Sequence, residues 1–370
     1  MTSADALAGK RIAFRTDASI EIGTGHVMRC LTLADALRAG GAACLFLCRA
    51  HDGHLIELIE ARGHRVAELP PAASAPSGVG DPAHAAWLGS GWHEDAVATR
   101  ELLGPAGADW LVVDHYAIDA RWERVLRSSV RRVLVMDDLA DRPHDCDLLL
   151  DPTLGRTQGA YRELVPDHAQ LLLGPQHALL RPEFAAARVD SLRRREHPRL
   201  RRLLVTMGGV DKDNATGRVL DALDTCFADA DIAVTVVMGP HAPWLAQVRH
   251  QVAQRRMPTQ LLVGVSDMAR LMSESDLAIG AAGGTSWERC CLGLPAFTLS
   301  LAQNQHEMSQ SLEMAGAVIA MTRADDIART MRRHFDEDCA ASLLARMIPA
   351  AAAVTSGQGV KILAERMCSL

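Results

Sequence analysis

Short apolar runs typical of buried strands alternate with helical patterns along most of this chain, and this alternation constrains the fold more than any other feature. In the first part of the chain, strand-like runs and helical patterns follow one another at residues 10–17, 25–41, 43–50, 54–64 and 65–69. The period of the apolar residues separates the two kinds of segment. Such a β-α-β-α-β series predicts a parallel sheet with helices on its faces.

The alternation continues after two interruptions. The stretch 70–91 is rich in Pro, Ala, Ser and Gly and is interpreted as a loop, and the segment 174–184 is interpreted as a crossover between domains. A second series of strand-like runs and helical patterns begins after residue 200. We therefore expect an α/β fold of two doubly wound, Rossmann-like domains that face a cleft. The expected domains are residues 1–180, and residues 190–370 with C-terminal helices.

Composition narrows the class of protein. The 370 residues suffice for two domains, whose cores must be aliphatic because 48% of residues are apolar but only 4% aromatic. The net charge is −6, and the one dense basic run, 193–202, is interpreted as a solvated linker flank rather than a nucleic-acid surface. No apolar run reaches the ~18 residues of a membrane helix, and the N-terminus does not resemble a signal peptide. Nine cysteines without a C-x-x-C pair indicate reduced, buried thiols. We expect a cytoplasmic protein without nucleic-acid, membrane or obligate protein partners.

The loop SIEIGTGHVMRC, residues 19–30, lies between the first strand-like run and the first helical pattern. Its two glycines resemble a nucleotide-binding loop, but Met28 replaces the third glycine of the dinucleotide fingerprint, and the Lys-Ser/Thr pair of a P-loop is missing. His26 instead follows the second glycine, at the first turn of the helix. The positive end of the helix dipole disfavours imidazolium, so a neutral ring can act as a base. Arg29, one turn later, can reinforce this effect or hold an anion.

Two glycine loops in the second half indicate a phosphate site. Gly208–Gly209 and Gly283–Gly284–Thr285 each follow a strand-like run and precede a helical pattern. Glycines let the backbone approach a ligand, and helix N-termini offer free N–H groups to phosphate. Glu288, on the first turn of the later helix, either complements the helix dipole or accepts the ribose hydroxyls of a nucleotide. Asn304 lies among amides that suit sugar hydroxyls but are also common in loops.

Other polar residues follow strands or occur in triplets. Asp114, His115 and Tyr116 end an apolar run, so they either point into the cleft or form a buried capping network. Three D-x-D triplets begin at residues 145, 211 and 229, but they have different surroundings, and acids are frequent in the chain. We therefore predict no metal site and no cofactor.

At this point the motifs resemble a known family. FRTDASIEIGTGHVMRCLTLADAL is similar to the opening of the UDP-sugar hydrolases of the pseudaminic acid pathway, and VVDHY, VMDDLADRPHDCDLLLDPT, GPQHALLRPEF, TMGGVDKDNAT, AIGAAGGTSWERCCLGLP and AQNQ match in order. The resemblance covers roughly residues 10 to 320. The chain departs from the family in its long 70–91 loop and in its tail beyond about residue 330.

The resemblance implies a two-domain GT-B fold, similar to the glycosyltransferase that builds lipid II. The implied reaction is metal-free hydrolysis of UDP-2,4-diacetamido-2,4,6-trideoxy-β-L-altropyranose, with inversion, to UDP and free sugar, in the synthesis of a bacterial surface glycan. His26 corresponds to the family's proposed general base. The UDP is expected on the second domain's glycine loops and Glu288.

The sugar is expected to lie beside His26 and to contact residues from both domains, namely Asp17, Asp114, His115, Tyr116 and Asn304. Gly25 and Arg29 are further expected substrate-binding residues, and Arg181 is expected to add charge stabilisation. The alternatives are an inverting GT-B glycosyltransferase, a hydrolase for a stereoisomeric UDP-diacetamido sugar, and a non-catalytic sugar-nucleotide-binding module, which would not need His26.

Overall fold

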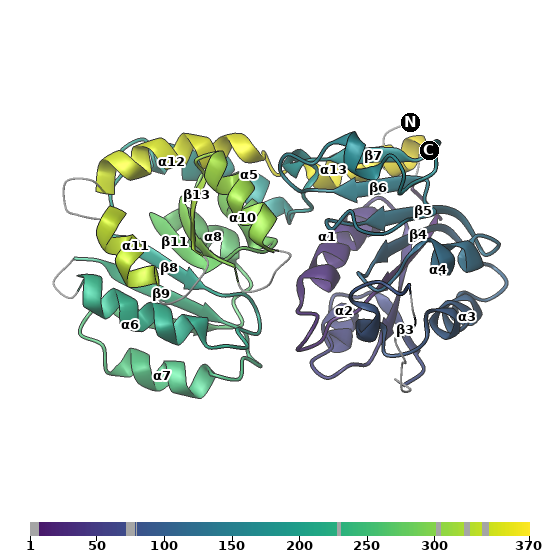
Figure 1. Ribbon diagram of the computed structural model, residues 1–370, viewed down its shortest axis with the longest axis horizontal. Helices are drawn as coiled ribbons and strands as arrows, with labels where there is room; N and C mark the ends of the chain where they lie inside the picture. Colours follow the sequence, from purple (N-terminus) through teal and green to yellow (C-terminus); the bar gives the residue numbers. More distant parts are fainter. Residues whose placement is uncertain are drawn as a thin grey trace. The chain divides into compact units, whose positions relative to one another are not determined.

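Two parallel sheets carry the fold, one in each of two compact units (Figure 1). Contacts divide the chain into a first unit, Met1–Leu179 with Gly359–Leu370, and a second unit, Leu180–Gln358. The computed structural model describes residues 7–71, 78, 80–227, 231–300, 305–321, 326–334 and 340–370. As expected from the alternation in the sequence, both units are doubly wound α/β structures.

The first sheet has seven strands in the order β3-β2-β1-β4-β5-β6-β7, and every neighbouring pair is parallel. The strands are β1 (Arg11–Thr16), β2 (Ala43–Arg49), β3 (Arg65–Leu69), β4 (Ala108–Asp114), β5 (Val130–Met136), β6 (Leu148–Asp151) and β7 (Gln170–Leu173). The unit's helices are α1 (Gly25–Ala39), α2 (Ile56–Ala61), η1 (Ala85–Leu88), α3 (Trp92–Leu103), α4 (Ala120–Leu126), η2 (Gln158–Tyr161), η3 (Pro175–His177) and α13 (Gly359–Ser369).

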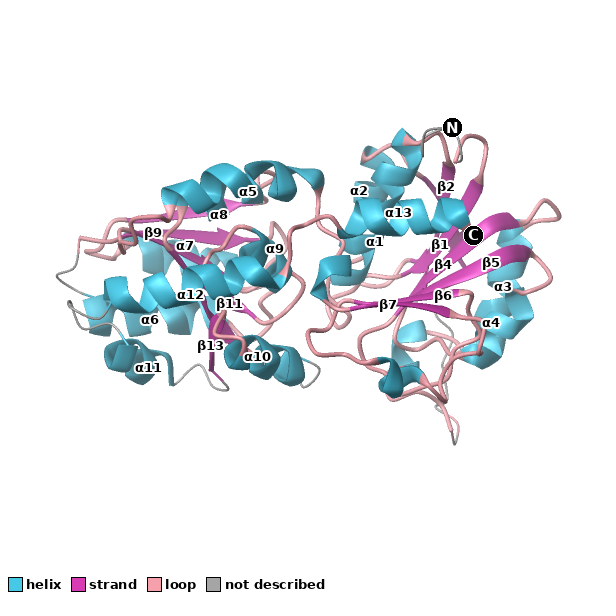
Figure 2. Cartoon of the chain, turned by 90° about the horizontal axis from the view of Figure 1, so that it is seen from above, coloured by secondary structure: helices cyan, strands magenta, loops and turns pink. Residues whose placement is uncertain are grey.

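Alternation along β1 divides the first core between the two faces of the sheet. Ile12 and Phe14 pack in one apolar cluster with α1, α2 and α13, whereas Ala13 packs in another with α3 and α4. Figure 2 shows these two groups of helices on opposite sides of the strands. A parallel sheet covered on both faces explains why its strands read as nearly continuous apolar runs.

The second sheet has six parallel strands in the order β10-β9-β8-β11-β12-β13. They are β8 (Arg202–Thr206), β9 (Ala233–Met238), β10 (Thr259–Val263), β11 (Leu277–Ala281), β12 (Ala296–Leu299) and β13 (Val318–Met321). The unit's helices are α5 (Pro182–Arg194), α6 (Ala215–Phe227), α7 (Leu245–Ala253), α8 (Met268–Glu274), α9 (Thr285–Cys291), α10 (Gln305–Met314), α11 (Ile327–His334) and α12 (Ala340–Val354). Residues of α6, α7 and α11 share an apolar cluster with β8 and β9.

The C-terminal helices differ from the expected domain division. Both were expected in the second domain, but α13 returns to the first unit. Its Leu363 and Met367 are buried in the same cluster as residues of α1, so hydrophobic packing rather than chain order decides which unit it joins.

The expectation of a solvated basic run at 193–202 is wrong for one of its members. Arg195 is only 4% exposed, and its guanidinium donates to backbone carbonyls of Ser191, Met272, Ser273 and Ser275. A buried arginine needs such acceptors, and here they come from α5 and from the end of α8. Arg195 therefore joins these helices instead of facing water.

The 30 residues Ala340–Ser369 meet the length and composition of a membrane span, contrary to the expectation that no run would. In the structure they form two helices, α12 and α13, with a break between Val354 and Gly359. α12 packs against α9, and α13 packs against α1. Their apolar residues thus contribute to the cores of the two units.

Candidate active site

Polar side chains of the first unit gather at the carboxyl ends of β1 and β4. The two strands are neighbours, but the chain continues from β1 to β2 on one side and from β4 to β5 on the other. Thr16, the last residue of β1, is paired with Asp114, the last residue of β4. In open α/β sheets, ligands bind outside the carboxyl ends of the strands at such a reversal of strand order.

The loop between β1 and α1 is a tight turn that leaves open space at the helix start. Ser19 Oγ accepts hydrogen bonds from two backbone N–H groups of the turn, at 3.1 and 2.9 Å, and Gly23 has a φ of +80°. Gly25 has no positive φ, and a Cβ built on it would meet nothing within 4 Å. Because the fold itself does not require a glycine at this position, the bare backbone of Gly25 suits the close approach of a ligand beside His26.

His26, in the first turn of α1, is hydrogen-bonded to Asp114, with 2.6 Å between Nδ1 and Oδ1. Burial alone would raise the pKa of Asp114, but the charge of Arg29 and the contact with His26 hold it below its usual range, so the carboxyl is ionised. A carboxylate only accepts, so Nδ1 carries a proton, and in the neutral form of the ring Nε2 has the lone pair of a base. No residue in the described ranges hydrogen-bonds to Nε2, and the His26 side chain is 8% exposed.

Arg29, one turn after His26, binds two carboxylates through its guanidinium. Its Nε and Nη2 donate to the two oxygens of Asp114, both at 2.6 Å, and its Nη1 donates to Asp138 at 3.0 Å. From the sequence, Arg29 was expected to reinforce the helix dipole or to hold an anion. In the structure, the anions that Arg29 holds are the side chains of Asp114 and Asp138. The pair of hydrogen bonds to Asp114 fixes the carboxylate that orients His26.

Asp138, just beyond the end of β5, joins this network, although it was not among the site residues expected from the sequence. It accepts hydrogen bonds from Arg29 and from the hydroxyl of Tyr116. The ring of Tyr116 stands edge-on to the ring of His26, with centroids 4.5 Å apart. The available signal was position, because Asp138, like Asp114, lies at the carboxyl end of an apolar strand.

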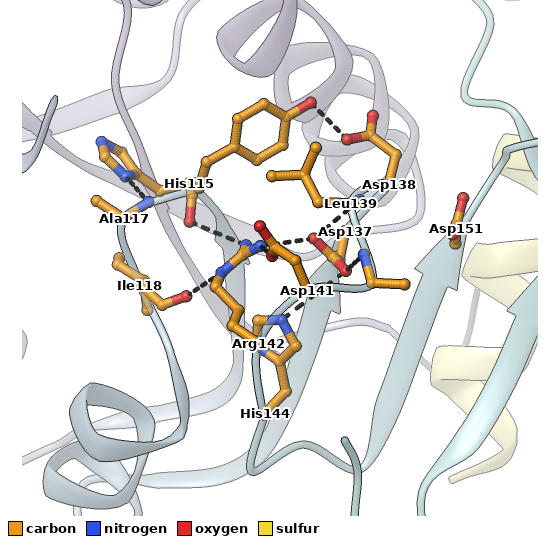
Figure 3. Close-up of polar contacts among 12 residues, drawn as sticks. His115, Ala117, Ile118, Asp137, Asp138, Leu139, Asp141, Arg142, His144 and Asp151 are labelled. Carbon is orange, nitrogen blue, oxygen red and sulfur yellow. Dashed lines mark hydrogen bonds and ion pairs between the residues drawn. The ribbon is translucent and has the colours of Figure 1, made fainter. Parts of the chain in front are cut away.

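Arg142 ties the loops after β4 and β5 together (Figure 3). Its Nε donates to the carbonyl of Ile118 at 2.8 Å, and its Nη1 donates to Asp137 and Asp141 at 3.0 and 2.9 Å. The guanidinium also lies 5.8 Å from the ring centre of Tyr116. Arg142 therefore fixes the backbone that carries Tyr116, and the loop that carries Asp138, although neither its residue type nor its position in the sequence indicated this role.

Asp17 and His115 are buried at the same edge, with exposures of 1% and 3%. Asp17 accepts from the backbone N–H of Arg49 at 2.7 Å and pairs with Arg15 at 2.8 Å. His115 Nδ1 accepts from the N–H of Ala117, so its ring proton is on Nε2, 3.3 Å from Asp17 Oδ2. Burial lowers the pKa of His115, so the ring stays neutral. These contacts hold the strand ends in place, and direct contact of Asp17 or His115 with a sugar stays a prediction.

An aromatic group from the 70–91 stretch lies against Tyr116. The Trp87 ring, on η1, stacks with that of Tyr116, with centroids 5.9 Å apart, and the His84 ring lies 4.3 Å from Trp87. An ion pair of 3.1 Å between Asp81 and Arg121 anchors the segment. The described part of this stretch therefore places two half-buried rings beside Tyr116, whose own ring contacts that of His26. The loop-like composition of the stretch did not indicate this feature.

The second unit repeats the reversal of strand order, between β8 and β11, and a glycine loop follows each of these strands. Gly208 has a φ of +86°, and a Cβ on Gly239 would collide with the carbonyl of Gly209, so both loops after β8 and β9 depend on glycine. Gly284, before Thr285 at the start of α9, has an ordinary φ of −53°, and a Cβ there would meet nothing within 4 Å. The structure thus brings Gly208–Gly209 and Gly283–Gly284–Thr285 to neighbouring strand ends, with bare backbone at Gly284.

Glu288 lies on α9, near Arg181 of the crossover segment. Burial raises the pKa of Glu288 to about 7, and the charges of Arg181 and Arg289 oppose that shift. Arg181 Nη2 is 3.9 Å from Glu288 Oε1, while its Nη1 donates to the carbonyl of Ser266 at 2.9 Å. Asn304 lies outside the described residues.

The acidic triplets have partners within the chain. Asp145 and Asp147 both pair with Arg127, at 2.9 and 2.7 Å. Asp211 accepts from the first backbone N–H groups of α6, at 2.8 and 2.9 Å, and so caps that helix. Asp229 lies outside the described residues. Within the described ranges, no group of three or more His, Cys, Asp or Glu side chains is placed to hold a metal ion.

Comparison of sequences confirms the resemblance inferred from the motifs. No model of a known protein family matches the chain. An uncharacterized protein of Methanocaldococcus jannaschii is 24% identical over 80% of this chain, and the spore coat polysaccharide biosynthesis protein SpsG of Bacillus subtilis is 30% identical over 43%. The aligned regions cover only 57% and 45% of those two relatives. The UDP-2,4-diacetamido-2,4,6-trideoxy-beta-L-altropyranose hydrolase of Campylobacter jejuni is 23% identical over 83% of this chain and 97% of its own.

Comparison of structures confirms the fold class. MurG of Acinetobacter baumannii superposes with a TM-score of 0.65 and 14% identity over 98% of this chain and all of its own. The HepE protein of Anabaena, solved with UDP and glucose, superposes with a TM-score of 0.55 and 14% identity over the same shares. The fold is of the GT-B type, as expected.

Proposed function

We propose that this chain is an enzyme that acts on a UDP-linked sugar, and that it hydrolyses the bond between the anomeric carbon and UDP. The observation that carries the proposal is the His26–Asp114 pair at the strand-order reversal, with Nε2 of His26 unoccupied by any described residue. The similarity to the Campylobacter jejuni hydrolase supports the substrate class, UDP-2,4-diacetamido-2,4,6-trideoxy-β-L-altropyranose. A non-catalytic binding module would not need such a pair.

In the proposed mechanism, His26 Nε2 removes a proton from the water that attacks the anomeric carbon on the face opposite UDP, which inverts the configuration. The transition state resembles an oxocarbenium ion, as in other glycosyl hydrolyses. Asp114 accepts from Nδ1–H and stabilises the imidazolium that forms, while Arg29 holds Asp114. This is the division of labour seen wherever a carboxylate orients a catalytic histidine.

We assign the nucleotide to the second unit. The backbone N–H groups of the glycine loops after β8 and β11 suit the diphosphate, and Glu288 suits the ribose hydroxyls. UDP is a good leaving group, so the loops need only stabilise its developing charge, and we assign no metal to the reaction. Asn304 and Arg181 remain candidate contacts for the sugar and for this charge.

The experiment is to incubate the chain with UDP-2,4-diacetamido-2,4,6-trideoxy-β-L-altropyranose and to follow the products by proton NMR. We expect UDP and a free sugar whose first-formed anomer has inverted configuration. A UDP-diacetamido sugar of different stereochemistry, run in parallel, measures selectivity. Release of UDP from neither substrate would contradict the proposal.

A second candidate is an inverting glycosyltransferase, because several structural neighbours are glycosyltransferases, including the spinosyn rhamnosyltransferase SpnG, which has a TM-score of 0.59. The same NMR experiment separates the two. A hydrolase releases free sugar without any acceptor, whereas a transferase leaves the UDP-sugar intact until an acceptor alcohol is added.

We further propose that the reaction takes place in the cytoplasm, as a step in the synthesis of pseudaminic acid or a related nonulosonic acid for a surface glycan. All eight described cysteines are free thiols, which fits a reducing compartment. Growth of a deletion strain and chemical analysis of its surface nonulosonic acid would test this assignment.

A further inference from the structure

Arg289, on α9, is a buried cation without an ion-pair partner among the described residues. Its side chain is 1% exposed, and only Nη2 is hydrogen-bonded, to the carbonyl of Ala281 and to Ser286 Oγ, each at 2.8 Å. Nε and Nη1 have no acceptor. Burial lowers the pKa of Arg289 to about 10, so the guanidinium remains charged at neutral pH.

The guanidinium lies at the strand-order reversal of the second sheet. Gly280 of β11 is paired with Thr206 of β8, and a Cβ on Gly280 would collide with Arg289 Nη1. Glycine inside a strand weakens it, so its presence here makes room for the charged group. The positive charge therefore lies directly behind the two loops that follow β8 and β11.

This placement is electrostatically unfavourable in the free protein. The side chain reaches back to Ser286, in the first turn of α9, so the cation adds to the positive end of that helix. Glu288 compensates only in part: its charge acts to raise the pKa of Arg289, but the two side chains form no ion pair, and burial raises the pKa of Glu288 itself to about 7. Arg195 shows the contrast, since it is also buried with a pKa near 10, but four backbone carbonyls accept its N–H groups.

We propose that Arg289 is the fixed positive charge of a diphosphate site formed by the loops after β8 and β11, and that it determines affinity for the anionic part of the ligand. A buried charge acts across several ångströms because little solvent screens it. Arg289 is thus a positioning residue that attracts the diphosphate through its field, while the backbone N–H groups of the loops make the contacts. The inference rests on the proposed function for the identity of the ligand as UDP.

The test compares ligands of increasing charge on the full chain. Affinities of uridine, UMP, UDP and inorganic pyrophosphate are measured by calorimetry for the wild type, Arg289→Gln and Arg289→Lys. We expect Arg289→Gln to weaken the affinity for UDP by roughly 10–50-fold, about 1.4–2.4 kcal/mol at 1.4 kcal/mol per tenfold, and the affinity for uridine by less than about 2-fold. Arg289→Lys keeps the charge, so its UDP-to-uridine ratio should stay within about 3-fold of the wild type even if the loss of hydrogen bonds lowers stability.

Arg195→Gln is the matched control. It also removes a buried arginine of the second unit, but the hydrogen bonds of Arg195 go to α5 and the end of α8 rather than to the loops after β8 and β11. It should lower the midpoint of urea unfolding and leave the UDP-to-uridine ratio unchanged. If Arg289→Gln weakens the affinities for uridine and UDP equally, or if Arg289→Lys lowers the UDP-to-uridine ratio as Arg289→Gln does, the residue only holds the loop in place. The inference is then wrong.

The failure of the proposed function gives a different result. A wild-type chain that binds pyrophosphate but not UDP would contradict the nucleotide assignment, and the Arg289 variants would then be judged on pyrophosphate affinity alone. Binding of neither anion by the wild type would overturn both proposals.

Discussion

Replacing Asp114 with Asn tests the proposed base more directly than replacing the base itself. The carboxylate accepts the 2.6 Å bond from His26 Nδ1 and two bonds from Arg29. An Asn amide has one acceptor and one donor group, so it cannot accept all three. If its NH₂ faces His26, it donates to Nδ1 and drives the ring proton to Nε2, where the lone pair of the base is needed. If its NH₂ faces Arg29, the amide and the guanidinium are both donors, so the hydrogen bond between them is lost.

The expected loss follows from these contacts. General-base assistance is worth ~10²–10⁴-fold, about 3–5 kcal/mol of barrier, and most of it should disappear from kcat while KM changes little. Stability should fall by about 1–3 kcal/mol, because Arg29 loses acceptors but keeps Asp138 at 3.0 Å. Release of UDP measures kcat, and urea unfolding measures stability.

A matched variant and a spectroscopic measurement make the test specific. Asp138→Asn also disturbs Arg29 and the Tyr116 hydroxyl but does not touch His26, so its loss of kcat should be at least tenfold smaller. Nitrogen-15 shifts of the His26 ring should place the proton on Nδ1 in the wild type and redistribute it in Asp114→Asn, whatever the substrate is. An Asp114→Asn enzyme with kcat within about 3-fold of the wild type would refute the reasoning.

The remaining predictions concern the base, the metal, the nucleotide and one titrating group. His26→Asn should lower kcat by ~10²–10⁴-fold and leave the Kd of UDP within about 2-fold, whereas near-normal kcat would end the assignment. Turnover should persist in EDTA, and a loss restored by Mg²⁺ or Mn²⁺ would contradict the metal-free reaction. UDP should slow amide hydrogen exchange in the loops after β8 and β11 but not in those after β1 and β4. The pKa of Glu288, raised from 4.5 to about 7, means that the folded state binds this proton more tightly than the unfolded state. Wild-type stability should therefore fall between pH 5 and 8 by about 3 kcal/mol relative to Glu288→Gln, and parallel curves from urea unfolding would refute this.

The sequence indicated the kinds of element well because the signals for them are local. Apolar periodicity marked β1, α1 and the strands that follow, and the burial of Val27, Cys30, Ala34 and Leu37 on α1 agrees with the helical pattern there. The pattern did not reveal that α13 joins the first unit, since an amphipathic helix does not encode which apolar surface will cover it.

By itself, the sequence determined the doubly wound fold, the glycine loops at strand ends and the position of His26 on the first turn of α1, because each depends on residues close together in the chain. Only the tertiary structure decided which charges meet. Strand order brings Asp114 to His26 across 88 positions and Asp138 to Arg29 across 109. Burial raises the pKa of Glu288, and the packing leaves Nε and Nη1 of Arg289 without an acceptor. Such pairings depend on how β1, β4 and β5, and likewise β8 and β11, lie side by side, and no local pattern specifies that order.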